Sequence, residues 1–318
     1  VSPVSPPNSP SIDALLEAAW TRREALHADP GTEAYRLFDG RPEGLPGWII
    51  DRYGPAVLLR RYGEPAEPAE QAAIVAWLAG RGLSVVLKEG GGEGRQVAGT
   101  PLEERGPLEV LEGGLRYGVE LLHGQNPGLF LDARPLRAWV RAASAGRRIL
   151  NLFAYTGAFG VAAAAGGARS ATNVELVPSA LERARANYER NGLEVDTRSF
   201  LRADVLDFLR RARTRGERWD GVICDPPPVP TRGPGRKGAG YDPRRDAQSL
   251  FGLALGRVEP GGWLLALSAA RGPSGFEDKL PEGPWEPMHR GDDFPGPRAE
   301  GMRALLRHLP PEVLPAGP

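Results

Sequence analysis

Cysteine, histidine and long apolar runs are all scarce in this sequence, and each scarcity excludes a class of protein. Cys224 is the only cysteine in 318 residues, so an internal disulfide framework is excluded. The four histidines show no metal-ligand spacing, which argues against a metal site. No apolar run approaches the roughly 20 residues that span a bilayer, and the first residues lack the basic and apolar blocks of a signal peptide. We therefore expect a cytoplasmic protein without a metal.

Lysine is also scarce, and neither sign of charge is in excess. The 40 basic side chains balance the 40 acidic ones, so the formal net charge is zero. This balance weakens the case for a nucleic-acid partner, although a neutral protein can still carry a basic groove. Lysine occurs only at positions 88, 237 and 279, and the other basic residues are arginines. Arginine suits bidentate phosphate contacts, but genomic base composition explains the same bias and the abundant Ala, Gly and Pro.

The most regular pattern lies in residues 148–227. An apolar, strand-like run ends near residue 153, a turn containing Thr156 and Gly157 follows, and residues 158–165 form a helix of small side chains. This is the first β-turn-α unit of an open α/β sheet, in which ligands bind beyond the carboxyl ends of the strands. Glycine in such a turn allows a ligand to approach the backbone closely.

Four further strand-like runs lie at residues 171–175, 200–204, 219–227 and 261–267, and the first three carry a carboxylate at their end. Glu175 ends the first of them, eighteen residues after Gly157, which is the spacing of an acid that binds ribose hydroxyls. Asp204 and Asp225 end the next two. The pattern predicts a Rossmann-like α/β domain with a nucleotide-type ligand at this edge.

Two kinds of ligand could bind at this edge of the predicted sheet. A dinucleotide would need Gly-x-Gly-x-x-Gly for its pyrophosphate, whereas Tyr155 takes the place of an early glycine and only Gly157-x-x-Gly160 is present. S-adenosylmethionine (SAM) has no phosphates and fits better. Its amino-acid tail would lie at the turn, its ribose at Glu175 and its adenine amino group at Asp204.

Four motifs then identify a family. They are Asn-Leu-Phe-x-Tyr-Thr-Gly-x-Phe from residue 151, Val-Glu-Leu from 174, Ala-Asp-Val from 203 and Asp-Pro-Pro from 225. In this order they resemble class I SAM-dependent rRNA methyltransferases, and most nearly the large-subunit rRNA cytosine-C5 subfamily. Residues 124–134 look like that subfamily's Gly-Gln-Lys-Thr-Gly-x-Phe-Leu-Asp-x-Arg segment, with Asn126 and Pro127 as departures. Residues 34–54 are similar to its small β-rich domain.

The resemblance implies roles for individual residues. The methionine part of SAM would contact Asn151, Phe153, Tyr155, Thr156 and Gly157. The ribose and adenine would contact Glu175, Leu176, Asp204 and Val205. The segment that would close over the cofactor contributes Phe130, Asp132 and Arg134. Asp225 and Pro226 would also contact the cofactor, and Asp225 would face the acceptor as the catalytic residue. A purely structural role, with Asp132 and Arg134 as a local pair, remains the alternative for that segment.

The domain organisation follows from these patterns. We expect a tail and helix at 1–30, an α+β accessory domain at 31–122, a class I methyltransferase domain at 123–309 and a tail at 310–318. The first helix would cover residues 12–26 with Ser11 as its N-cap. Accessory strands are expected at 47–51, 57–61, 85–88 and 116–121, with a helix at 71–78. The resemblance also implies an RNA-binding module before the β-rich domain, which we expect to be missing.

Cytosine-C5 chemistry is not expected. Cytosine C5 is a poor nucleophile, and the family uses a cysteine that adds to C6. The matching stretch after the fifth strand, residues 267–271, reads Leu-Ser-Ala-Ala-Arg. Cys224 lies in an apolar strand, where a small buried hydrophobe is expected. An exocyclic amine, ring nitrogen or hydroxyl would need no such cysteine, although Pro228 and Val229 supply no aromatic ring for stacking on a base.

A basic loop follows the fourth strand. It contains Arg232, Arg236, Lys237, Tyr241, Arg244 and Arg245. Such a loop could grip an RNA backbone or form a solvated lid, and the sequence leaves both open.

Three functions therefore stay open. The favoured one is SAM-dependent methyl transfer to RNA, with ribosomal RNA as the family substrate and a possible homodimer as the family assembly. The alternatives are methyl transfer to a small molecule and a catalytically silent SAM-binding protein. The lost cysteine and neutral charge favour the first alternative. A degraded acceptor pocket beside intact cofactor motifs would give the second.

Overall fold

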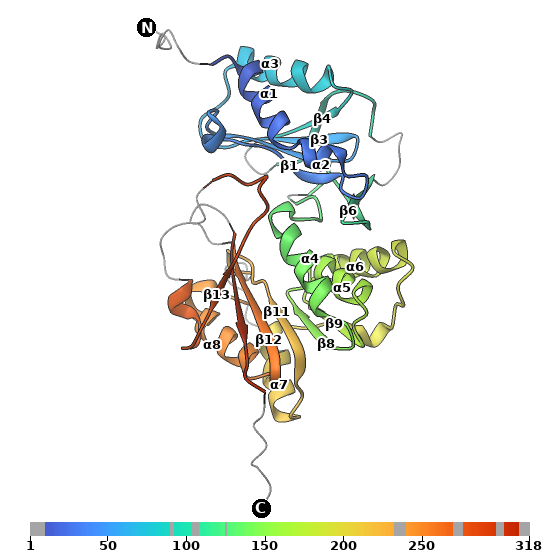
Figure 1. The fold of residues 1–318 in the computed structure, drawn as a ribbon, viewed down its shortest axis with the longest axis vertical. Helices are drawn as coiled ribbons and strands as arrows, with labels where there is room; N and C mark the ends of the chain where they lie inside the picture. The colour runs from blue at the N-terminus through green and yellow to red at the C-terminus, as the bar shows by residue number, and fades with distance from the viewer. Residues whose placement is uncertain are drawn as a thin grey trace, which may run out of the picture. The chain divides into compact units, whose positions relative to one another are not determined.

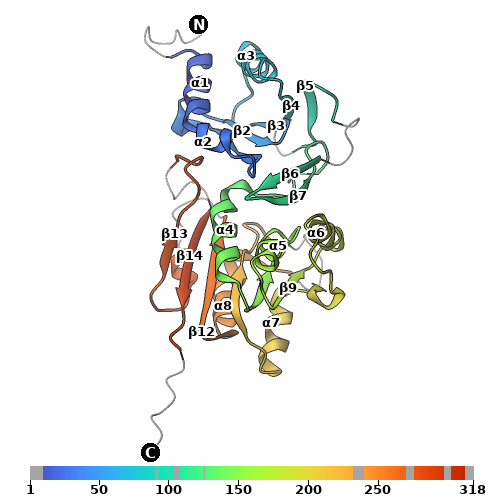
Figure 2. The same ribbon diagram turned by 45° about the vertical axis from the view of Figure 1, so that its right-hand side comes forward.

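The computed structural model describes residues 10–89, 92–102, 108–124, 126–231, 240–269, 276–296 and 302–311. The chain forms two compact units (Figures 1 and 2). The N-terminal unit comprises Val1–Asp132 and Gly291–Gly296, and the C-terminal unit comprises Ala133–Arg290 and Pro297–Pro318. No helix among the described residues is long and apolar enough to cross a membrane.

The N-terminal unit is built on a five-stranded sheet. Its strands, in spatial order, are β1 (Ala34–Asp39), β2 (Trp48–Tyr53), β3 (Ala56–Arg61), β4 (Ser84–Glu89) and β5 (Arg95–Ala98). Neighbours are antiparallel except β3 and β4, which are parallel and joined by α3 (Pro68–Ala79). Helix α3 and the first helix pack on the sheet through Leu16, Ile74 and Leu78. A separate hairpin consists of β6 (Leu108–Glu112) and β7 (Leu115–Val119).

Most accessory elements lie where the sequence predicts them. The expected strands at 47–51, 57–61 and 85–88 overlap β2, β3 and β4, and the strand at 116–121 overlaps β7. The expected helix at 71–78 lies inside α3. Strands β1, β5 and β6 are additional, because short strands that alternate irregularly leave a weak periodic signal.

The first helix differs from the prediction. Ser11 is its N-cap, as expected, and its side chain accepts a hydrogen bond from the Ala14 amide at 3.2 Å. The helix does not reach residue 26, however, because it breaks at Arg23 into α1 (Ile12–Arg22) and α2 (Glu24–Ala28). The Arg23 side chain is 1% exposed and donates five hydrogen bonds, one for each guanidinium N–H. Tertiary contacts of one side chain thus end the helix.

The C-terminal unit is a seven-stranded sheet between helices. Its strands are β8 (Arg148–Leu152), β9 (Ser170–Glu175), β10 (Phe200–Arg202), β11 (Trp219–Cys224), β12 (Val258–Ser268), β13 (Glu286–Met288) and β14 (Arg303–His308). The spatial order is β10-β9-β8-β11-β12-β14-β13, and β14 runs antiparallel to the other six strands. The helices are α4 (Arg134–Ala143), α5 (Ala158–Ala165), α6 (Pro178–Arg190), α7 (Val205–Thr214) and α8 (Pro243–Leu255).

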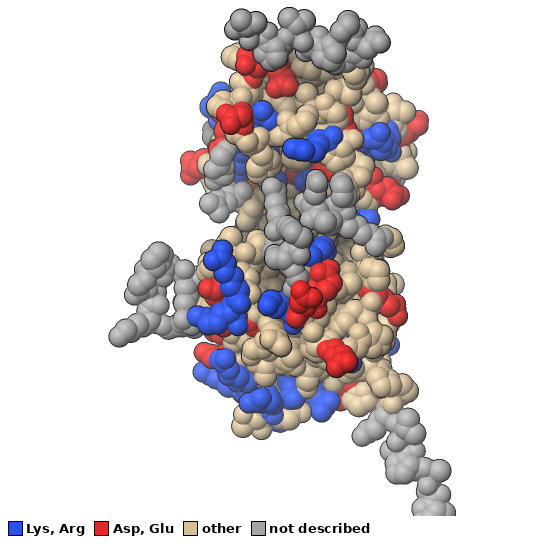
Figure 3. Space-filling view, turned by 90° about the vertical axis from the view of Figure 1, so that its left-hand side faces the viewer, with Lys and Arg blue, Asp and Glu red and all other residues tan. Residues whose placement is uncertain are grey.

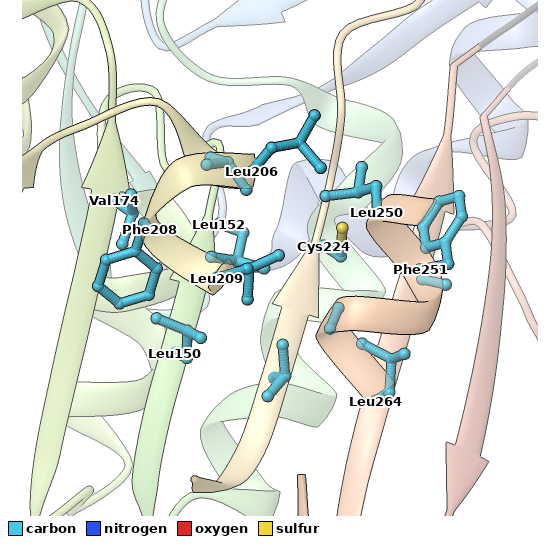
Figure 4. Packing of buried hydrophobic residues seen from close by; sticks show 14 of the residues in the cluster. Leu150, Leu152, Val174, Leu206, Phe208, Leu209, Cys224, Leu250, Phe251 and Leu264 are labelled. Carbon is cyan, nitrogen blue, oxygen red and sulfur yellow. The ribbon is translucent and has the colours of Figure 1, made fainter. Parts of the chain in front are cut away.

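Both faces of this sheet are covered. Leu150 and Leu152 of β8 point to the face of α7 and α8, where they join a core that includes Leu209 and Leu250 (Figure 4). Ile149 joins the core on the opposite face, which α4 and α5 cover. Burial on both faces explains the nearly continuous apolar strands. The chain order reverses between β8 and β11, so the edge beyond these two strands is the topological switch point where ligands bind in such sheets.

Several strand ends differ from the predicted ones. Residues 203 and 204 lie outside β10 because Asp204 is the N-cap of α7 and accepts a hydrogen bond from the Asp207 amide at 3.1 Å. Strand β11 ends at Cys224, since the prolines that follow Asp225 have no N–H for a sheet hydrogen bond. Strand β12 begins at Val258, three residues earlier than expected.

A short segment from near the end of the chain belongs to the N-terminal unit. In Gly291–Gly296 the Asp293 side chain is buried and accepts a hydrogen bond from the Arg36 amide at 2.9 Å. The Asp293 carbonyl accepts another from Arg23 at 2.8 Å. The Arg36 guanidinium lies 4.4 Å from the centre of the Phe294 ring.

Candidate cofactor site

The turn after β8 has an unusual backbone. Phe153 and Tyr155 have positive φ angles of 56° and 49°, and Gly157 has a φ of 75°. Residues other than glycine rarely adopt this left-handed conformation. Such strained residues cluster at ligand sites, where the surrounding structure holds them in place. The turn formed by residues 153–157, which we call the cofactor turn, is therefore the first element of the candidate site.

Glu175 fastens the cofactor turn to the end of β9. Its Oε2 accepts a hydrogen bond from the Tyr155 amide at 2.9 Å. Its Oε1 accepts hydrogen bonds from the amides of Leu176 at 2.8 Å and Val177 at 2.9 Å. A carboxylate has about four acceptor positions, so these three donors leave capacity for a ligand hydroxyl. Glu175 is partly exposed, as a ligand contact must be.

The glycines of the turn are explained by packing. A Cβ atom on Gly157 would lie 2.8 Å from the Cβ of Ala184 in α6. A Cβ atom on Gly160 would lie 2.2 Å from Oδ1 of Asn173 and 2.6 Å from the hydroxyl of Tyr188. Close contact with α6 and β9, together with the positive φ of Gly157, therefore requires glycine at these positions. Close ligand approach, the reason expected from the sequence, is not what these contacts show.

Asn151 points into the interior of the unit. Its side chain is 2% exposed, and its Nδ2 donates to Oδ1 of Asn173 at 2.9 Å. Asn173 in turn donates to the Tyr188 hydroxyl at 3.0 Å. Burial raises the pKa of Tyr188, so the hydroxyl stays neutral. These contacts indicate a structural role for Asn151, and its contact with the methionine part of SAM stays a prediction.

The remaining residues of the cofactor turn are held by α6 and by the core. Thr156 is buried, and its carbonyl accepts a hydrogen bond from Asn187 at 2.9 Å. The Tyr155 ring lies 6.0 Å from the Arg183 guanidinium, and burial raises the pKa of Tyr155 despite that positive charge. Nothing in the local sequence of the turn predicts these partners, which lie some thirty residues later.

The ends of β9 and β10 bring two predicted residues to the same edge. Glu175 is in register with Arg202, and the Ala203 amide donates to the Glu175 carbonyl at 3.1 Å. Asp204 follows directly and is partly exposed, while Val205 is buried at the start of α7. Asp204 thus combines a helix-capping role with a position at the ligand edge.

Asp225 leaves the sheet beside the cofactor turn. Cys224 is in register with Leu152, so Asp225 and Phe153 both follow directly after paired residues. Cys224 itself is fully buried in the core drawn in Figure 4. Burial, reinforced by the charge of Asp225, raises the pKa of the thiol well above its usual value. The thiol is therefore neutral and enclosed, as expected for a structural cysteine.

Tyr241, which the sequence placed in a basic loop that could grip RNA or form a solvated lid, is a core residue. It is 3% exposed, and its ring lies 5.3 Å from that of Phe153 in an edge-to-face contact. Hydrogen bonds join it to Thr231, whose amide donates to the Tyr241 carbonyl at 2.9 Å. The segment 232–239, with two arginines and a lysine, lies outside the described residues. Arg244 and Arg245 belong to the first turn of α8.

The segment predicted to close over the cofactor, residues 124–134, contributes residues to both units. Phe130, which is 45% exposed, and Asp132 belong to the N-terminal unit, and Arg134 is the first residue of α4 in the C-terminal unit. The sequence did not indicate that a helix begins there. In the described part of the chain, no group of three or more His, Cys, Asp or Glu side chains is arranged to hold a metal ion.

An open, mostly parallel sheet with a strained turn and two acidic strand ends at its switch point defines a Rossmann-like domain of the kind that binds nucleotide-type ligands. The family model for S-adenosylmethionine-dependent methyltransferases matches residues 66–274. The chain belongs to this family, so SAM is its cofactor and methyl transfer is its reaction.

Individual relatives support the assignment. The chain is 34% identical over 275 residues to ribosomal RNA large subunit methyltransferase I of Klebsiella pneumoniae strain 342, covering 83% of this chain and 67% of the relative. The chain thus spans about two thirds of the relative's length. A crystal structure of a putative methyltransferase complexed with SAH matches with a TM-score of 0.83 and 25% identity, covering 94% of this chain and 83% of the other. A putative SAM-dependent methyltransferase from Streptococcus mutans matches with a TM-score of 0.82 and 25% identity, over 94% and 82% of the two chains.

Proposed function

We propose that the chain transfers the methyl group of SAM to RNA, with ribosomal RNA as the substrate class. The observation that carries this proposal is the 34% identity, over 275 residues, to a ribosomal RNA large subunit methyltransferase. The formal net charge is zero, and the face drawn in Figure 3 shows basic and acidic side chains interspersed. Binding would therefore depend on local arginine contacts with phosphates rather than on a uniformly basic surface.

The proposed cofactor position follows the edge of the sheet. The methionine part lies along the cofactor turn, where Phe153, Tyr155 and Gly157 shape the backbone. The ribose hydroxyls meet Glu175 with Leu176, and the adenine meets Asp204 with Val205. The residues fit SAM because Glu175 retains acceptor capacity after three backbone donors. The turn also does without the dinucleotide glycine pattern, which a ligand without phosphates does not need.

The bound SAM supplies an electrophilic methyl group, and the protein has to position the acceptor against it. Asp225 is proposed to do so, because it leaves the sheet next to the cofactor turn and is stiffened by the prolines that follow. Its carboxylate can accept a hydrogen bond from an acceptor amine or hydroxyl and orient it for the transfer.

The acceptor atom is proposed to be nucleophilic by itself. Covalent activation of cytosine C5 needs a thiolate, and the only cysteine of the sequence, Cys224, is buried as a neutral thiol in the core. Leu267, Ser268 and Ala269 occupy the stretch where the family's cysteine is expected. An exocyclic amine, a ring nitrogen or a hydroxyl therefore fits the site better than cytosine C5.

The test is transfer of a labelled methyl group from SAM to total cellular RNA and, separately, to a small-metabolite extract. The Asp225→Ala variant should lose the transfer, whereas Asp207→Ala, which removes an exposed partner of Arg210 on α7, should keep it. Calorimetry with SAH on all three proteins shows whether cofactor binding is intact. Label in the extract alone would make the acceptor a small molecule, and SAH binding without label in either pool would indicate a silent binder.

The proposed acceptor chemistry has its own test. Cys224→Ala should retain methyl transfer to RNA, because the thiol is enclosed in the core. Loss of transfer in a variant that still binds SAH would instead show that the thiol takes part in the reaction. Digestion of the labelled RNA to nucleosides then identifies the methylated atom.

A further inference from the structure

Helix α6 contacts the cofactor turn through one of its faces. Residues 183 and 184 of α6 lie four and three positions before residue 187, so both lie beside it on one face of the helix. Ala184 and Asn187 are both buried, with exposed fractions of 0% and 1%. The Asn187 Nδ2 donates a hydrogen bond of 2.9 Å to the carbonyl oxygen of Thr156, in the middle of the turn.

The neighbours of Asn187 fix the two flanking residues of the turn. Ala184 lies so close to Gly157 that a Cβ there would approach its own Cβ to 2.8 Å. The Arg183 guanidinium lies 6.0 Å from the Tyr155 ring centre. Three side chains of one helix thus meet three consecutive residues of the turn.

The contact between α6 and the cofactor turn stabilises a disfavoured backbone conformation. Left-handed backbone at a residue other than glycine is disfavoured and persists only where several contacts determine it. Phe153 and Tyr155 are two such residues, and Glu175 fixes only the Tyr155 amide. The Asn187–Thr156 hydrogen bond fixes the carbonyl side of the same turn. Because an amide is neutral, it does so without adding a charge beside a cationic cofactor.

We propose that Asn187 is a positioning residue for the cofactor, which holds the turn in its SAM-binding conformation through the Thr156 carbonyl. This inference rests on the proposed placement of the methionine part at the cofactor turn. It assigns control over cofactor affinity to a buried residue of α6 that belongs to none of the motifs described above. The acceptor site and the nature of the acceptor do not enter it.

Two substitutions separate this role from a general effect on folding. In Asn187→Asp an oxygen replaces the donor and faces the Thr156 carbonyl, so the two acceptors repel. In Asn187→Ala the carbonyl merely loses this donor. Asn191→Asp is the matched control, because Asn191 donates at 2.7 Å to the Asn187 carbonyl within the helix end, away from the turn. All variants are compared with wild type by calorimetric titration with SAH and by thermal unfolding.

The expected order of SAH dissociation constants is Asn187→Asp above Asn187→Ala above wild type. The aspartate variant should bind about tenfold more weakly, which is what the loss of one hydrogen bond to a constrained site gives. The KM for SAM should rise by a similar factor, while kcat at saturating SAM and the KM for RNA stay unchanged. Asn191→Asp should lower the unfolding temperature without changing SAH affinity.

The opposite outcomes are equally clear. If both Asn187 variants lose thermal stability and keep the wild-type SAH affinity, Asn187 is structural only and the inference is wrong. If kcat falls at unchanged KM for SAM, the residue acts on the transfer and not on the cofactor. Should Asn187→Asp fail to fold, Asn187→Ala carries the same comparison. Failure of wild type to bind SAH would instead overturn the proposed cofactor site itself.

Discussion

The two units of the molecule bury polar groups of different kinds. The N-terminal unit buries charged side chains, among them Arg23, Glu43, Asp51 and Asp293. The C-terminal unit buries mainly neutral ones around the cofactor turn, namely Asn151, Thr156, Asn173 and Asn187.

The charged network is held together by mutual neutralisation. Burial opposes the charge of Arg36, but Asp51 and Asp39 outweigh it and raise the pKa of the guanidinium. Arg60 adds a second cation on Asp51. Such a network strongly favours one geometry. It is also sensitive to mutation, because removal of one partner leaves a buried charge without a counter-charge. The buried amides of the C-terminal unit fix a geometry without adding net charge, which suits a site for a positively charged cofactor.

The largest effect is expected from neutralising one charge in the N-terminal unit. Glu43→Gln leaves the buried Arg23 without its counter-charge and should destabilise that unit by about 3–5 kcal/mol. Urea unfolding of wild type and Glu43→Gln measures the loss in the free energy of unfolding. Glu17→Gln removes the exposed partner of Arg81 and should cost only about 0–1 kcal/mol. Equal losses in the two variants would contradict the contrast between buried and exposed pairs.

A methyl group placed in the amide network should have a smaller effect. Gly160→Ala forces a Cβ into Asn173 and Tyr188 and should destabilise the C-terminal unit by about 1–3 kcal/mol. Gly252 lies in α8, and a Cβ atom added there would have no described atom within 4 Å apart from its chain neighbours and the backbone of its own helix. Gly252→Ala should therefore stabilise the unit by about 0.4–1 kcal/mol. Thermal unfolding followed by circular dichroism should therefore shift in opposite directions for these two variants.

Removing one hydroxyl from the same network should cost less again. Tyr188→Phe deprives the buried Asn173 amide of an acceptor, and a loss of about 0.5–1.5 kcal/mol is expected. Urea unfolding measures it. A loss as large as that of Glu43→Gln would show that amides and charges are equally critical, contrary to the difference expected between the two units.

The smallest effect concerns pH. Burial lowers the pKa of His27, although its hydrogen bond to the Trp20 carbonyl acts in the opposite direction. The unfolded chain, with a histidine pKa of about 6.5, then binds the proton first as the pH falls. The stabilising contribution of neutral His27 is full above that pH and is lost as the pH falls through the folded pKa. His27→Gln should remove this part of the pH dependence in unfolding curves recorded from about pH 8 to about pH 5.

The sequence predicted five of the seven strands of the C-terminal unit, β8 to β12, and the residues at their ends, because these follow from local patterns. Strands β13 and β14 were not predicted. Apolar runs that end at Glu175 and Asp204 mark strand ends, and helix 158–165 was found with its observed bounds. The residues that hold the edge in shape were not predictable in this way. Asn187 and Tyr188 belong to an ordinary amphipathic helix, and their partners are fixed only by tertiary packing. The same holds for Arg23, whose buried bonds break a helix that periodicity would continue.

The segment Gly291–Gly296 has a consequence for cutting the molecule apart. The chain passes between the units after Asp132, before Gly291 and after Gly296, so neither unit is one continuous stretch of sequence. A fragment ending at residue 132 would lack Asp293 and leave the Arg36 amide and one Arg23 N–H without their acceptors. The complementary fragment, from residue 133 onward, would contain Asp293 without the residues that it binds. Gene fusions, split expression and exchange of modules between relatives must therefore keep both stretches together.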